Sequence, residues 1–175
     1  MKRLALCAAL SIFPLVSAHA QSNYASLNLS YVTIEGDALA SDVTVPGISA
    51  VAGTQLTPFL GVEARLGTSA SDTVRGMGST VDLQLQYHAG VYVRGTYELG
   101  QATAYALAGV TRTSLDIKVN GESAFVTLDR LSYGAGLQLL IDPRTNTYGV
   151  IEYINYLDKD DTTISAISIG ALMRF

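Results

Sequence analysis

Residues 81–97 read VDLQLQYHAGVYVRGTY, and this stretch decides the fold. Almost every odd-numbered position carries Val, Leu, Ala or Tyr, whereas the even-numbered positions carry mainly Asp, Gln, His, Arg, Thr or Gly. Side chains alternate between the two faces of a strand, so the pattern predicts one strand with an apolar and a polar face. Its length is about three times that of an average soluble strand. A membrane needs only roughly 9–11 residues per strand, and longer strands project from it. The stretch therefore predicts a transmembrane β-strand.

The composition agrees with strands in lipid. The chain has 175 residues, of which 49% are hydrophobic and 15% charged, and its mean hydropathy is +0.29. These values are too apolar for a disordered chain. After the first twenty residues, however, no apolar run reaches the roughly 20 residues of a membrane helix. The apolar residues alternate with Ser, Gln, Gly and Arg instead, which favours strands over helices.

The amino-terminal residues have the three parts of a secretory signal peptide. Lys2 and Arg3 form its charged start, residues 4–16 are apolar, and Ala18-His19-Ala20 is a cleavage site. We therefore predict a cleaved signal over residues 1–20 and one barrel domain over residues 21–175. Cleavage removes the single Cys and two of the 11 basic residues, which leaves 9 against 15 acidic residues, or −6. Nucleic-acid binding requires a basic stripe, so nucleic acid is excluded as a partner.

Alternation of varying clarity predicts seven further strands. They cover residues 26–31, 47–56, 60–67, 102–119, 130–139, 148–156 and 167–175, and the second and the sixth of these are the least clearly bounded. Short turns over residues 57–59, 98–101 and 142–146 alternate with longer loops or raised tips over residues 35–46, 68–80, 118–123 and 158–162. Unpaired strand edges in lipid cost several kcal/mol per group, so the sheet must close. The predicted fold is all-β, an eight-stranded antiparallel up-and-down transmembrane β-barrel.

These features resemble the small outer-membrane β-barrels, namely the OmpA barrel domain, OmpX and the opacity proteins. The segments that carry the resemblance are residues 60–67, 105–109, 133–136 and 168–175. The resemblance implies the outer membrane of a Gram-negative cell, short turns in the periplasm, and contact with membrane lipid and lipopolysaccharide. It also implies an assembly signal for the outer-membrane assembly machinery, formed by Ile169, Ala171, Met173 and Phe175. Phe175 is alternatively a plain lipid-facing residue. A monomer is expected.

The polar face of the strands predicts what fills the barrel. An eight-stranded barrel is just wide enough for its inward side chains to fill it. The charged or titratable residues predicted there are Glu63, Arg65, Asp82, His88, Arg94, Arg130, Glu152 and Arg174, joined by Gln84, Gln86, Tyr92 and Gln138. Buried charges survive when they are paired. We expect Glu63, Glu152, Arg94 and Arg174 to form a plug, and the sequence does not assign which of them form ion pairs with one another. A narrow ion path is the alternative, and a wide porin is excluded by the strand count.

Asn120-Gly121 between two alternating runs predicts a two-residue hairpin. Val119 then pairs with Glu122, and the same register places Tyr105 opposite Gly136, Leu107 opposite Gly134 and Arg112 opposite Asp129. Beyond Arg112 and Asp129 the polarity inverts, so that Ser114 and Lys118 face outward. This predicts that the strands leave the membrane and that the hairpin protrudes. The residues assigned to the protruding hairpin are Leu115, Ile117, Val119, Asn120, Gly121 and Phe125. Its apolar inner face packs on neighbouring loops or its edge binds an extracellular protein.

Catalytic and metal-binding signals are weak. His88 is the only His beyond the signal, and a filled lumen gives a substrate no route to it, so we expect a hydrogen-bonded structural histidine. Residues 158–161, DKDD, lack the Gly and the spaced Glu of a calcium loop and are interpreted as a solvated tip. We expect no catalytic residue, cofactor or metal. The predicted role is structural and adhesin-like, with a low-conductance channel as the first alternative and a lipid A-modifying enzyme as the second.

Overall fold

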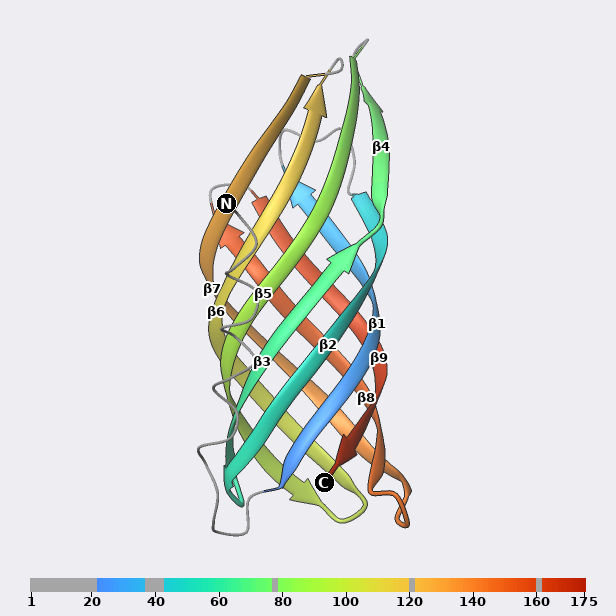
Figure 1. Ribbon diagram of the computed structural model, residues 1–175, viewed down its shortest axis with the longest axis vertical. Helices are drawn as coiled ribbons and strands as arrows, with labels where there is room; N and C mark the ends of the chain where they lie inside the picture. Colours follow the sequence, from blue (N-terminus) through green and yellow to red (C-terminus); the bar gives the residue numbers. More distant parts are fainter. Residues whose placement is uncertain (1–21, 37–42, 77–78, 120–121, 160–161) are drawn as a thin grey trace, which may run out of the picture.

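The computed structural model describes residues 22–36, 43–76, 79–119, 122–159 and 162–175 (Figure 1). The predicted signal peptide and the tips of four connections lie outside these residues. No helix in the described part of the chain is long and apolar enough to cross a membrane. The described strands are β1 (Asn23–Gly36), β2 (Val43–Thr57), β3 (Leu60–Ser69), β4 (Ser71–Gly76), β5 (Ser79–Leu99), β6 (Ala102–Val119), β7 (Glu122–Asp142), β8 (Thr147–Lys159) and β9 (Thr162–Arg174).

The strands form one closed antiparallel barrel, as the sequence predicts. Their order is β3-β2-β1-β9-β8-β7-β6-β5-β4, and a further pairing of β3 with β5 closes the ring. β3 and β4 are two parts of one membrane strand, because both pair with β5 in one register: Gly67 lies opposite His88 and Ser71 opposite Gln84. Nine segments therefore make eight staves. The first and last staves, β1 and β9, are neighbours along their whole length.

The three short turns match the prediction and lie at one end of the barrel, here called the turn end (Figure 1). Gly100 and Asn146 have φ values of 73° and 50° in two of these turns. Gly adopts this left-handed region without cost, and Asn is among the residues that tolerate it. The opposite end, where the longer connections lie, is called the hairpin end. The predicted loop over residues 68–80 is mostly strand, because β4 and β5 stay paired up to Gly76 and Ser79.

A β-bulge interrupts the strand that decides the fold. Tyr87 pairs with Ser114, but Leu85 pairs with Leu115, so Gln86 is the extra residue on β5. A bulge shifts the alternation of faces, and the prediction of one unbroken alternation over residues 81–97 is therefore wrong. Ser114, which was predicted to face outward, is buried beside the bulge. Asp82 pairs with Lys118, and directly paired residues share a face, so placing Asp82 inside and Lys118 outside is inconsistent.

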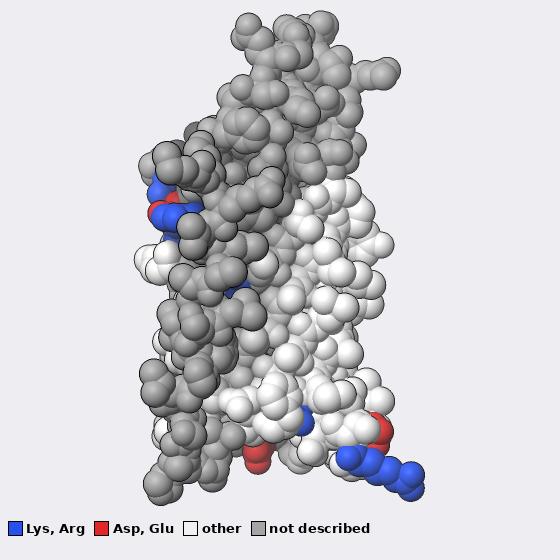
Figure 2. Space-filling view, viewed as in Figure 1, with Lys and Arg blue, Asp and Glu red and all other residues white. Residues whose placement is uncertain are grey.

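The outer wall between the two ends is apolar. The exposed side chains of the wall include Leu27, Leu29, Leu66, Val91, Val93, Val110, Leu131, Leu137, Ile151, Ile167 and Ile169. In the part of the surface that is not grey in Figure 2, charged side chains lie at the lower end and in a group at the upper left. The white wall between these two levels is largely uncharged. So large a continuous apolar surface is not tolerated in water, and a bilayer is the environment that covers it.

Candidate functional site: the lumen and the raised sheet

Arg65 on β3 is the centre of a buried charge network in the lumen. Its Nη2 donates to Oε2 of Glu152 at 2.6 Å, and its Nη1 makes a second short contact with Oε1 of the same carboxylate. Its Nε also donates to Oε1 of Glu63 at 2.6 Å. All three side chains are almost completely buried. One guanidinium thus bridges two carboxylates on opposite parts of the wall, a geometry that suits its planar set of donors.

Two tyrosines complete the hydrogen bonding of the carboxylates. The hydroxyl of Tyr24 donates to Oε2 of Glu63 at 2.9 Å, and the hydroxyl of Tyr105 donates to Oε2 of Glu152, also at 2.9 Å. The sequence places Tyr105 inside the barrel but gives no role to Tyr24. The available signal is the small residue opposite each ring, because Tyr24 pairs with Gly53 and Tyr105 pairs with Gly136. A Cβ at either glycine would overlap the tyrosine.

Arg94 on β5 supplies a second positive charge beside Glu63, and most of its contacts are with aromatic rings. Its Nη1 lies 3.5 Å from Oε2 of Glu63. Its guanidinium carbon lies 3.7 Å from the ring centre of Tyr105 and 5.1 Å from that of Tyr24. Its Nε and Nη2 have no hydrogen-bond partner among the described residues. Cation–π contacts are strengthened in such a desolvated site.

Three of the four residues predicted to form the plug lie in this network, and the fourth does not. Glu63, Glu152 and Arg94 belong to it, whereas Arg174 lies at the turn end, donates to Oε1 of Gln138 at 3.1 Å and stacks on Tyr148. Arg65, and not Arg174, is the arginine that joins the two carboxylates, because it lies on β3 only two residues from Glu63. Arg130 is also outside the network. Its Nη1 donates to the backbone oxygen of Asp129 at 2.8 Å.

A second, apolar layer fills the lumen towards the hairpin end, which the sequence analysis did not identify. It is formed by β1, β2, β8 and β9, and its buried members are Val32, Ile34, Val43, Val45, Ile154, Ile164 and Ala166. The inward positions of β1 change from Asn28 and Ser30 to Val32 and Ile34. This change of polarity along one face was the signal available in the sequence. The layer lies on one side of the lumen, since the buried residues of the facing β6 and β7 towards this end are polar, namely Thr111, Thr113, Ser114 and Ser132.

His88 is buried, with 2% of its surface exposed. Its ring centre lies 4.7 Å from that of Tyr156. Neither imidazole nitrogen has a hydrogen-bond partner among the described residues, so the expected hydrogen-bonded histidine is not found there. The described residues also contain no group of three or more His, Cys, Asp or Glu that could hold a metal ion. Residues 160–161 of the acidic tip and the side chains of Asp82, Asp158 and Lys159 lie outside the description.

At the hairpin end the wall divides into two sheets. Pairing of β7 with β8 ends at Tyr133 and Asn155, and pairing of β2 with β3 ends at Gly47 and Ser69. Beyond these levels β4, β5, β6 and β7 remain paired with one another and extend further than the other strands (Figure 1). We call this part the raised sheet. It consists of residues 71–76, 79–85, 113–119 and 122–132.

The register of the raised sheet confirms the hairpin prediction. Val119 pairs with Glu122, and the pairing continues without a shift down to Ala102 and Leu139. The predicted partners Arg112 and Asp129 form a bidentate pair on the outer surface, with two donor–acceptor distances of 2.7 Å. The tip residues Asn120 and Gly121 lie outside the described residues, as do the side chains of Leu115, Ile117, Val119 and Phe125.

One edge of the raised sheet has no strand beside it. The segment Glu122–Ser132 of β7 pairs with β6 but, among the described residues, with no strand on its other side. Its lower end is fixed by Ser132, whose hydroxyl contacts the backbone oxygen of Tyr156 at 3.1 Å and the hydroxyl of Thr111 at 2.8 Å. The rest of this edge presents unpaired backbone groups, which can pair with another extended chain.

A closed eight-stranded barrel with an apolar outer belt and a filled lumen defines the class of small outer-membrane barrels. The chain matches the family described as outer membrane protein beta-barrel domain over residues 5–175, and it belongs to that family. The protein therefore lies in the outer membrane. No curated protein matches the chain.

Solved structures of the same fold are similar over nearly their whole length. Ail, the attachment invasion locus protein of Yersinia pestis, is 18% identical with a TM-score of 0.66, and the match covers 88% of this chain and 98% of Ail. Neisserial surface protein A is 13% identical with a TM-score of 0.68, covering 90% and 100%. Ail has also been solved in complex with the heparin analogue sucrose octasulfate, at 18% identity and a TM-score of 0.65, covering 89% and 99%. At these identities the likeness shows the fold alone.

Proposed function

We propose that this protein is a non-enzymatic surface-interaction barrel that presents its raised sheet to an extracellular protein, in the manner of an adhesin. The observation that carries the proposal is the unpaired edge Glu122–Ser132 of β7. It is backed by three further strands, so a partner strand would add to a sheet that is already formed. Strand addition to an exposed edge is a common mode of peptide recognition, because the backbone groups supply the affinity.

The chemistry of the exposed surface favours a protein over a polyanion as the partner. Ail has been solved in complex with a heparin analogue, whereas the chain here has a net charge of −4, or −6 after the predicted cleavage. The exposed Arg112 at the base of the raised sheet is already paired with Asp129. Arg130 is the one other arginine of the raised sheet whose side chain is described, and a sulfated polysaccharide would need a cluster of unpaired cations there. An edge that binds backbone groups has no such requirement.

The proposal includes assembly and oligomeric state. Ile169, Ala171 and Met173 on β9 and Phe175 directly after it are exposed at alternate positions, which supports a role as the assembly signal as well as lipid contact. We propose a monomer in the outer membrane, in contact with lipid and lipopolysaccharide.

The channel alternative gains no support from the lumen, where the apolar layer lies over the charge network. The enzyme alternative gains none either, because His88 is buried and no described hydrogen bond links it to an acid or a hydroxyl.

The edge can be blocked without disturbing the sheet behind it. Leu140 N donates to the oxygen of Gln101 at 3.0 Å, so even-numbered residues of β7 bond to β6 and odd-numbered residues direct their N–H groups to the other side. The odd position Thr127, which is exposed, is therefore suitable for Pro, which removes an edge donor. Thr127→Ala is the matched control, because it changes the side chain and keeps the donor.

The test is binding of the nanodisc-embedded barrel to a panel of host-surface and serum proteins. We expect a partner whose affinity falls about tenfold or more with Thr127→Pro, which corresponds to roughly 1.4 kcal/mol or more, and is unchanged with Thr127→Ala. Equal binding by both variants would exclude the edge as the binding site. For the enzyme alternative, lipid A mass profiles of cells with wild-type protein and with His88→Ala should be identical.

A further inference from the structure

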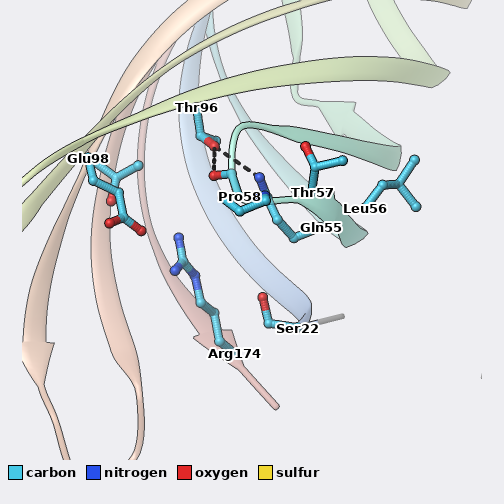
Figure 3. Close-up of a pocket in the computed structure, with 9 residues that line it drawn as sticks. Ser22, Gln55, Leu56, Thr57, Pro58, Thr96, Glu98 and Arg174 are labelled. Atoms are coloured by element: carbon cyan, nitrogen blue, oxygen red, sulfur yellow. Dashed lines mark hydrogen bonds between the residues drawn. The ribbon is translucent and has the colours of Figure 1, made fainter. Parts of the chain in front are cut away.

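A polar pocket opens at the turn end of the barrel, the end opposite to the raised sheet, and Figure 3 shows the residues that line it. Its volume is about 300 Å³. The walls come from the β2–β3 turn and from the ends of β1, β5, β6 and β9. The residues that matter most are Gln55, Thr96, Glu98, Thr103 and Arg174. A volume of this size is at the lower end of the range for ligand sites, and it suits a molecule of one or two amino-acid residues.

Arg174 is the cation of this pocket, and it is held in place by neutral groups. Its Nη2 donates to Oε1 of Gln138 at 3.1 Å, and its guanidinium carbon lies 4.6 Å from the ring centre of Tyr148. Gln138 is fully buried, so this contact is fixed by the barrel wall. Arg174 takes part in none of the ion pairs found among the described residues. Its positive charge is therefore positioned but not neutralised.

Glu98 lies in the same pocket with the opposite charge. It is exposed and also takes part in none of the ion pairs of the described residues. Figure 3 shows the guanidinium of Arg174 pointing into the space below Thr96, with Glu98 at its side. The hydroxyl of Thr96 contacts the backbone oxygen of Pro58 at 3.2 Å and accepts from Nε2 of Gln55 at 2.9 Å. The pocket thus presents a cation, an anion and an ordered polar wall.

The upper boundary of the pocket is the charge network of the lumen. On β5 the inward position next to Thr96 is Arg94, and on β6 the inward position next to Thr103 is Tyr105. These two residues stack on each other at 3.7 Å. On these two strands the stacked pair therefore lies between the pocket and the rest of the lumen.

We propose that this pocket binds a small dipolar carboxylate, either a free amino acid or the carboxyl end of a short peptide. The carboxylate pairs with the guanidinium of Arg174, whose free donors match its two oxygens. The ligand's ammonium or amide N–H donates to Glu98. The two charges of the pocket then match the two ends of the ligand. This site is independent of the proposed role of the raised sheet, so either proposal can fail without the other.

The experiment is a titration of the refolded barrel in nanodiscs, followed by backbone amide NMR shifts. The probes are dialanine, dialanine amide, which lacks the carboxylate, N-acetyl-dialanine, which lacks the ammonium, and acetate, which has a carboxylate alone. We expect dialanine to shift the amides of Gln55, Thr96 and Thr103 and to saturate in the millimolar range. Dialanine amide should bind about tenfold or more weakly than dialanine, because it loses a charge-assisted hydrogen bond to Arg174. No saturable shift at these residues, or equal binding of acetate and dialanine, would overturn the proposal.

Variants assign the two charges separately. Arg174→Gln should abolish saturation, whereas Arg144→Gln, which removes an exposed arginine of the neighbouring β7–β8 turn, should leave it unchanged. Glu98→Gln should remove the preference for dialanine over N-acetyl-dialanine. Equal effects of the two arginine variants would contradict the assignment. Since Arg174 adjoins the assembly signal, folding of Arg174→Gln is checked by its heat-modifiable gel mobility, and if it fails to fold, the probe series with Glu98→Gln decides.

Discussion

Arg65 on β3 and Glu152 on β8 form a two-point ion pair across the lumen, although 87 residues separate them in the chain. The same guanidinium also contacts Glu63, so one cation is shared between two buried carboxylates, and Arg94 beside Glu63 supplies the second positive charge. Removal of this cation should therefore have a larger effect than removal of any exposed charge.

The first prediction concerns Arg65→Leu. It leaves Glu63 and Glu152 buried without their main partner, and breaking a buried pair in this way costs about 3–5 kcal/mol. Urea unfolding of the barrel in lipid vesicles should show a loss of this size. The double variant that adds only Glu152→Gln should recover much of the stability, because Glu63 keeps Arg94 as its partner and no buried charge is left alone. Arg112→Leu is the control, because its pair is exposed and solvent screens it, and a similar loss there would contradict the central role of Arg65.

The second prediction concerns Gly136→Ala. A Cβ there would overlap the hydroxyl of Tyr105 and break its hydrogen bond to Glu152. Overpacking of this kind costs about 1–3 kcal/mol. Gly95→Ala is a matched control, since nothing lies within 4 Å of its added Cβ and both substitutions stiffen the unfolded chain equally. Adding Tyr105→Phe to Gly136→Ala should relieve part of the overlap, and equal stability of both alanine variants would argue against this packing.

The third prediction concerns ion conduction. The charge network crosses the lumen from Arg65 to Glu152, and the apolar layer that includes Val32 and Ile164 lies nearer the hairpin end. Planar-bilayer recordings should therefore show no stable conductance for the wild type, and neither Arg94→Ala nor Glu152→Ala should create one. Stable steps whose size changes in either variant would revive the channel alternative.

The fourth prediction concerns the raised sheet. Replacing residues 116–125 by Asn-Gly joins the hydrogen-bonded partners Leu115 and Val126 through a two-residue turn. The charge network lies below this level, so the shortened barrel should fold with nearly unchanged stability in urea. Binding of any partner of the raised sheet should be lost in the same variant. Retained binding would place the partner elsewhere on the surface.

The register of the hairpin could be predicted from sequence because a two-residue Asn-Gly turn fixes every pair below it. The pairs within the lumen could not, because a long arginine side chain reaches several inward positions, and only the barrel's curvature brings Arg65 to Glu152. The bulge at Gln86 also escaped prediction. It leaves the alternating pattern of residues 81–97 intact in the sequence and changes only which face each residue occupies. Tyr24 was missed because a tyrosine fits either face of a strand.

The strand ends carry one further consequence. Asn23 and Phe175 exchange two backbone hydrogen bonds, of 3.0 and 2.9 Å, at the place where the first and last staves meet. This seal joins the two most distant parts of the folded chain, so its closure carries the greatest entropic penalty and should come last. Until this closure the backbone N–H and C=O groups along the open edges of β1 and β9 are unpaired in lipid, which cannot form hydrogen bonds with them. Completion of the ring is thus an all-or-none event, decided by the final residues to arrive.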